Sequence, residues 1–288
     1  MCIAFIKVAR SNLDKYKLIL LNNRDEQLLR PTLAMHWHDR ILSGVDEQDT
    51  ARGTWLGLNN QGRVGMMLSI TQPQDSKDPC APSRGGIVNE FLKAENTTDM
   101  MKTLRQSAHR YNGFQLVGFE RYGTSVDLFA SYKNFKTPTG LYDIRTLTNQ
   151  QVGTVEICQW SDEECYVISN SPPLKPYKKA QHGLGLLKEK LEKSNEQLVE
   201  QIFGSLLDIA KDSVRCYPDA QLQLQTQNSD EYNHSLSSIF IKYPEGTRQY
   251  GTRCHTLLTV DQNEKVNILE RRLEGSTWHD TRFEFVLN

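Results

Sequence analysis

Runs of strand-forming residues occur in two batches along this chain, and segments with helical spacing follow each batch. The predicted strands are residues 2–8, 17–22, 54–58, 63–70, 113–118, 125–132, 152–158, 164–169, 237–243, 255–260, 265–270 and 281–287. The predicted helices are residues 84–95, 98–110, 177–193 and 195–211. This order is typical of two sheets covered by helices, an α+β architecture. We therefore expect one layered domain over residues 1–288.

Two further segments are predicted to be irregular. Residues 137–150 contain proline and glycine, which predicts an exposed loop or a sheet edge. Residues 217–235 are rich in Gln, Asn, Ser and Asp, which predicts a loop or a partly disordered stretch.

Charge and composition exclude several classes of protein. The chain has 34 basic and 35 acidic side chains and a net charge of −1, so we expect no nucleic-acid partner. No apolar run approaches the roughly 18 residues of a spanning helix, so an integral membrane protein is not expected. The start of the chain has no basic region before a long apolar segment, which argues against a secretory signal and favours the cytoplasm. No C-x-x-C pair occurs, so no metal site is predicted from cysteine spacing.

Cys2 follows the initiator methionine directly and opens the first predicted strand. If Met1 is removed, Cys2 carries a thiol and a free α-amine, whose pKa lies at about 7.7–8. Such an amine can act as the base for its own thiol near neutral pH. The alternative is that Cys2 is an ordinary residue without a chemical role.

Asp25 lies in a polar tetrad, Asn23-Arg24-Asp25-Glu26, at the end of the second predicted strand. If the first two strands pair as a hairpin, Asp25 comes close to Cys2. A carboxylate there can hydrogen-bond the α-ammonium and steer its titration. The alternative is a solvated turn in which Asp25 caps the following residues.

Two later positions carry groups that stabilise negative charge. Asn170 follows a predicted strand and can donate an amide hydrogen bond to a developing oxyanion. Arg253 lies just before another strand and can orient a carboxylate. The alternatives are a turn residue for Asn170 and a surface cation for Arg253.

These motifs, taken in order along the chain, resemble the NRDE family, also called the transport and Golgi organisation protein 2 family. The matching blocks are Met1-Cys2, Asn23-Arg24-Asp25-Glu26 with Arg30-Pro31, Gly53-Thr54-Trp55-Leu56-Gly57, Tyr111-Asn112-Gly113-Phe114, Ser169-Asn170, Tyr250-Gly251-Thr252-Arg253 and Thr281-Arg282-Phe283-Glu284-Phe285. The resemblance therefore covers essentially the whole chain.

The resemblance implies a four-layer αββα sandwich similar to the N-terminal nucleophile hydrolases. It also implies that Cys2, Asp25, Asn170 and Arg253 are the catalytic set if the protein is a hydrolase. Family members are associated with intracellular heme trafficking, with mitochondrial or Golgi phenotypes and with lipid homeostasis. The resemblance thus implies heme as cargo, with heme donor and acceptor proteins or membranes as partners.

The residues themselves offer limited support for heme. A heme site needs an apolar slot, axial donors and cations for the propionates. His36 and His38 flank Trp37 and would share one face of a strand, although such a pair more often belongs to a surface strand. Arg24 and Arg253 can hold propionates, and Asn23, Glu26 and Trp55 are expected to line the same cleft. Trp55 can equally be a core residue of the sheet.

Two functions follow as hypotheses. The first is a heme-binding and heme-trafficking factor in the cytoplasm, with association to mitochondria or Golgi left open. The second is an amidohydrolase in which Cys2 attacks an acyl-amide and Asn170 stabilises the oxyanion. A binding scaffold for another small apolar carboxylate or lipid is the remaining interpretation.

Overall fold

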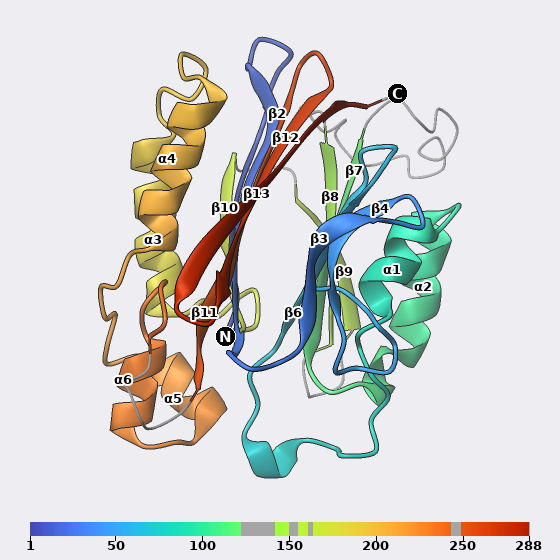
Figure 1. Ribbon diagram of the computed structural model, residues 1–288. Helices are drawn as coiled ribbons and strands as arrows, with labels where there is room; N and C mark the ends of the chain where they lie inside the picture. The colour runs from blue at the N-terminus through green and yellow to red at the C-terminus, as the bar shows by residue number, and fades with distance from the viewer. Residues whose placement is uncertain (122–141, 150–154, 161–163, 243–248, 288) are drawn as a thin grey trace.

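Two antiparallel β-sheets pack face to face and carry helices on their outer faces, which gives four layers in the order αββα (Figure 1). This computed structural model describes residues 1–121, 142–149, 155–160, 164–242 and 249–287. The α+β sandwich expected from the sequence is confirmed. No helix within these ranges is long and apolar enough to cross a membrane.

The first sheet joins the two ends of the chain. Its strand order is β10-β1-β2-β11-β12-β13. The bounds are β1 Ile3–Val8, β2 Tyr16–Gln27, β10 Cys165–Ile168, β11 Tyr250–Asp261, β12 Lys265–Glu274 and β13 Thr277–Val286. The predicted β1–β2 hairpin is present, with Ile3 opposite Asn23 and Val8 opposite Leu18.

The second sheet uses a continuous part of the chain, in the strand order β3-β4-β5-β6-β7-β8-β9. The bounds are β3 Thr32–His38, β4 Ile41–Asp46, β5 Leu56–Asn59, β6 Val64–Ser69, β7 Phe114–Arg121, β8 Tyr142–Asn149 and β9 Val155–Trp160. The chain passes from the first sheet to the second between β2 and β3.

Two helix layers cover the outer faces (Figure 1). The helices α1 Ile87–Lys93 and α2 Thr97–Ser107 pack on the second sheet, and α3 Lys178–Lys190 and α4 Val199–Ala210 pack on the first. Two short helices, α5 Ala220–Thr226 and α6 Asp230–Leu236, lie near the N-terminus. Two single 3₁₀ turns, η1 Gln74–Ser76 and η2 Ala108–Arg110, complete the elements.

Period-two alternation along β1 and β2 divides the core. Ala4 and Leu20 lie in the apolar cluster between the two sheets, whereas Ile3, Phe5 and Leu21 belong to the cluster under α3 and α4. Because successive side chains of a strand point to opposite faces, β1 and β2 each contribute to two cores. The same alternation continues into the polar tetrad at the end of β2.

Several local predictions were wrong. The segment 137–150 contains β8, which lies between β7 and β9 rather than at an edge. The polar segment 217–235 contains α5 and α6, whose N-caps Asp219 and Ser229 accept backbone hydrogen bonds from Leu222 and Tyr232. The described part of the predicted strand 237–243 forms no regular strand and has one isolated bridge, between Lys242 and Gly251.

The sequence analysis did not predict the β3–β4 pair. It considered a strand only around His36 and His38. The predicted strand 125–132 lies outside the described residues. The α1, α2, α3 and α4 helices occur where helical spacing predicted them, with ends shifted by a few residues.

Candidate functional site

The N-terminus, the end of β2 and the start of β11 meet at one end of the first sheet, which we call the Cys2 end. The Cys2 thiol donates to the backbone carbonyl of Asp25 at 3.8 Å. The Met1 amine and the Tyr250 hydroxyl also reach this oxygen, at 3.4 Å and 3.2 Å. The Met1 amine additionally donates to the Tyr250 hydroxyl. The predicted closeness of Cys2 and Asp25 is therefore present.

The Asp25 carboxyl group is buried, with 3% of the residue exposed. Its Oδ1 accepts a hydrogen bond from the Thr252 hydroxyl at 2.5 Å, and Oδ2 has no partner among the described residues. Burial raises the pKa of Asp25 to about 6, while the N-terminal ammonium, Lys179 and Thr252 act in the opposite direction. Burial also raises the pKa of the Cys2 thiol, although the N-terminal ammonium opposes this shift.

Lys179 is a buried residue at this end that the sequence interpretation missed. It lies in the first turn of α3 and is 1% exposed. Its ammonium donates to the carbonyl oxygens of Leu236 at 3.0 Å and Ser238 at 3.1 Å. Lys179, Gly183 and Leu187 share the buried face of α3 at a spacing of four residues. The position of this lysine on the apolar face of a predicted helix is the signal that could have identified it as a buried residue.

Asn170 follows β10 and ties the two sheets together. Its side-chain amide donates to the backbone carbonyl of Ser69, at the end of β6. Its own carbonyl accepts from the Thr71 amide at 2.8 Å. The side-chain Oδ1 is buried without a partner among the described residues. The amide donor expected for an oxyanion is thus engaged between the sheets.

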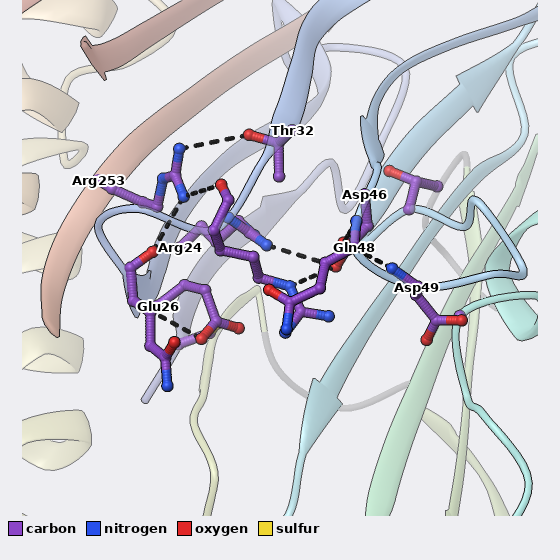
Figure 2. Close-up of polar contacts among 12 residues, drawn as sticks. Arg24, Glu26, Thr32, Asp46, Gln48, Asp49 and Arg253 are labelled. Carbon is purple, nitrogen blue, oxygen red and sulfur yellow. Dashed lines mark hydrogen bonds and ion pairs between the residues drawn. The ribbon is translucent and has the colours of Figure 1, made fainter. Parts of the chain in front are cut away.

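Arg253 lies at a bulge in β11, where the pairing with β2 shifts between Thr252 and Cys254. Its guanidinium donates to the carbonyl oxygens of Gln27 at 3.0 Å and Arg30 at 2.6 Å, and to the Thr32 hydroxyl at 3.4 Å (Figure 2). Arg253 therefore clamps the crossover between β2 and β3. In this arrangement Arg253 fixes the end of β2 to the start of β3.

Arg24 faces the space between the sheets and has few partners. Its guanidinium carbon lies 4.1 Å from the ring centroid of Trp55, and Nη2 lies 3.7 Å from Oδ2 of Asp46. Asp46 is shared with Arg30, whose Nε lies 2.8 Å from the same oxygen (Figure 2). The residue is 4% exposed, yet its guanidinium donates no hydrogen bond to a described residue, and Asp46 is its ion-pair partner at 3.7 Å.

Glu26 points in the same direction as Arg24 along β2 and is partly exposed (Figure 2). Its carboxylate accepts a hydrogen bond from the amide of the adjacent Gln27 at 2.8 Å. The nearby Arg253 carries a pKa lowered by burial and by the positive charge of Arg24. Cationic side chains thus dominate the neighbourhood of Glu26.

Asn23 points to the opposite face of the sheet, toward α4. Its amide donates to the carbonyl oxygens of Ala210 at 2.9 Å and Ile239 at 3.3 Å. Its Oδ1 lies 2.8 Å from Nδ1 of His255, and the His255 ring stacks on Trp278 with centroids 4.7 Å apart. The structure therefore separates Asn23 from the cleft that Arg24 was expected to share with it.

His36 and His38 lie on the outer face of the second sheet, with ring centroids 5.0 Å apart. They line a cavity of about 400 Å³ together with Asn89 and Lys93 of α1. Trp37, between them in sequence, packs against Phe285 on the inner side. The histidine pair is therefore separated from Arg24 and Trp55 by the sheet, and no group of three or more metal-ligating side chains occurs in the described ranges.

Comparisons with known proteins bear on the whole chain. A sequence model of the family described as Transport and Golgi organisation 2 matches residues 1–275. The Transport and Golgi organization 2 homolog of Mus musculus and its Homo sapiens counterpart are each 31% identical, over 100% of this chain and 99% of theirs. The Transport and Golgi organization protein 2 of Drosophila melanogaster is 28% identical over 99% of this chain and 98% of its own.

The fold also has a known relative. The C2A mutant of conjugated bile acid hydrolase from Clostridium perfringens superposes with a TM-score of 0.52, over 100% of this chain and 97% of that one. It has the N-terminal nucleophile hydrolase fold, and its sequence identity to this chain is 8%. At this identity the likeness concerns the fold alone.

Proposed function

Because the chain belongs to the Transport and Golgi organisation 2 family, built on an N-terminal nucleophile hydrolase fold, we propose that it binds and carries heme at the Cys2 end. The observation that carries this proposal is the state of Arg24. Its guanidinium is stacked on Trp55, and its N–H groups have no hydrogen-bond acceptor among the described residues.

Arg24 and Trp55 together match an amphipathic carboxylate. Guanidinium groups bind carboxylates through paired, charge-assisted hydrogen bonds. The Asp46 carboxylate, at 3.7 Å, balances the charge of Arg24 without occupying its donors. The partly exposed indole of Trp55 offers a flat apolar surface beside that cation. A heme propionate on Arg24 would place the edge of the macrocycle against this surface.

Arg253 supports the site indirectly in this proposal. Its donors hold the β2–β3 crossover, and the direction of β2 fixes where Arg24 points. The family resemblance supplies heme as the cargo, and the residues supply the recognition of a carboxylate beside a flat ring. Glu26 lies next to Arg24 and would disfavour ligands with more negative charge than the cations can balance.

A heme titration followed by the Soret band tests the proposal. We expect saturable one-to-one binding to the native protein, weakened by about tenfold or more in Arg24→Glu, since a paired carboxylate contact is lost. Arg105→Glu is the matched control, because Arg105 is exposed on α2 and the charge change is the same. Equal affinity of the native protein and Arg24→Glu would contradict the proposal.

A second candidate function is an amidohydrolase, favoured by the contact between Cys2 and Asp25 at 3.8 Å. The related bile acid hydrolase carries its C2A substitution at the same residue number. In this chain the nitrogen of Cys2 forms a peptide bond with Met1, so an α-amine base requires the removal of Met1. The thiol would then attack an amide carbonyl while the amine accepts the thiol proton.

Intact mass of the protein isolated from cells, followed by an acyl-amide screen, tests this second function. A mass without Met1 and hydrolysis that is lost in Cys2→Ala would support it. A retained Met1 would contradict it, because the amide nitrogen of Cys2 is not basic. Heme binding that survives in Cys2→Ala would separate the two functions.

We further propose that the protein acts in the cytoplasm and exchanges its cargo with proteins or membranes of mitochondria or Golgi. The family description supports the Golgi part of this proposal. Fractionation of cells with a tagged chain tests it, and exclusive recovery from another compartment would contradict it.

A further inference from the structure

Lys179 is the most deeply buried ammonium group in the described residues that enters no salt bridge within 4 Å. Two of its three N–H groups are engaged by the carbonyl oxygens of Leu236 and Ser238. A buried ammonium is costly unless an opposite charge lies nearby. The negatively charged group that most strongly favours its charged form is Asp25.

Lys179 contacts a short stretch of chain directly, and Asp25 is linked to the same stretch through Thr252. Lys179 donates to residues Leu236 and Ser238, at the end of α6 and just beyond it. The Asp25 carboxyl accepts from Thr252, whose hydroxyl accepts in turn from the amide of Ile241 at 2.9 Å. The segment 236–241 thus places the ammonium and the carboxyl on one side of the first sheet, beneath Cys2.

We propose that Lys179 is a positioning residue that keeps the Asp25 carboxyl ionised beneath Cys2. This proposal rests on the proposed function only in its location, because both concern residues at the Cys2 end. An ionised Asp25 attracts the N-terminal ammonium and holds the residues that precede β1. Without the Lys179 charge, the Met1 ammonium and the Thr252 hydroxyl would remain to favour the ionised carboxylate.

The other charged and titratable groups near this pair are few. The Met1 ammonium and Glu26 act on Asp25 from the neighbouring chain, and the Cys2 thiol and Tyr250 hydroxyl contact its backbone carbonyl. Cys2, Cys216 and Arg215 act on Lys179. Of these, Glu26 acts against the ionised form of Asp25, whereas the Met1 ammonium favours it.

The test is the pH dependence of thermal unfolding of the unliganded full-length protein. In Lys179→Met we expect the midpoint at pH 7.5 to fall on the order of 10 °C, because the buried Asp25 carboxylate loses a cation that favours its charged form. The deficit should shrink as the pH falls and Asp25 takes up its proton. Lys179→Arg should behave like the native protein, and Asp25→Asn combined with Lys179→Met should regain most of the loss.

Three results would overturn the proposal. One is a deficit in Lys179→Met that is equal at pH 7.5 and pH 5. Another is a double variant no more stable than Lys179→Met. If Lys179→Met does not fold, Asp25→Asn alone decides. It removes a favourable charge from Lys179, so its stability should rise with pH more steeply than that of the native protein above pH 7, where Asp25 itself no longer titrates. An equal slope above pH 7 contradicts the proposal. These unfolding experiments use the unliganded protein, so their outcomes do not depend on whether heme binds.

Discussion

The residues of the polar tetrad Asn23–Glu26 alternate between the two faces of β2, and the two faces differ in how these residues are bound. On the face toward α3 and α4, Asn23 makes three hydrogen-bond contacts and Asp25 is held by Thr252. On the face toward the second sheet, Arg24 stacks on Trp55 and its donors find no acceptor in the described residues. Asn23 and Asp25 therefore stabilise the fold, whereas the N–H groups of Arg24 stay available to bind a ligand. A sequence motif on one strand can therefore hold two separate roles.

The largest expected effect falls on the helix-facing side. Asn23→Ala should lower the free energy of unfolding by about 3 kcal/mol, because it strands the buried carbonyls of Ala210 and Ile239 and the ring of His255. Denaturant unfolding measures this. Asn22→Ala is the matched control, since Asn22 is buried on the other face and donates no hydrogen bond to a described residue. If both variants lose equal stability, the contrast between the faces is wrong.

A smaller effect concerns pH on the same face. Burial lowers the pKa of His255 to about 3, below the unfolded value of 6.5, so the folded state holds this ring neutral. Its contribution to stability is complete above pH 6.5 and falls as the pH drops toward 3. By pH 5 the loss should reach about 2 kcal/mol.

His255→Gln removes this titration and should make the acid side of the stability curve shallower by that amount, as measured by urea unfolding at pH 7 and pH 5. Asp25 acts in the opposite sense: its raised pKa makes the folded state gain stability as the pH falls through 6. A curve for His255→Gln that is as steep as the native one would show that His255 is not held neutral.

The smallest effect on stability is expected on the inner face, where the effect on binding should be larger. A Cβ at Gly44 would lie 2.6 Å from Cη2 of Trp55, so Gly44→Ala must displace the indole. We expect a loss of about 1 kcal/mol in stability and a clear loss of heme affinity. Gly185→Ala is the control, because nothing lies within 4 Å of its added carbon. Unchanged heme affinity in Gly44→Ala would remove Trp55 from the proposed site.

The sequence was sufficient to predict the hairpin that brings Cys2 to Asp25, because two apolar, strand-forming runs are joined there by a polar connection. The separation of Asn23 from Arg24 also follows from period two, although the interpretation placed them in one cleft. Lys179 could not be assigned a partner from the sequence, since its contacts come from residues near 236 that only the fold brings to it. The α5 and α6 helices were missed because their stability comes from caps and packing rather than from a strong apolar stripe.

The composition of the first sheet has a consequence for how the protein is made. Asp25 and its partner Thr252 are 227 residues apart, and β2 pairs along its length with β11. The second sheet, in contrast, draws all its strands from residues 32–160. On a ribosome the second sheet can form while the first still lacks four of its six strands, since contacts between distant residues form late. The Cys2 end is then completed only after the last part of the chain has been synthesised, and a chain that stops before β11 carries the whole Asn23–Glu26 tetrad without the strand that holds it in place.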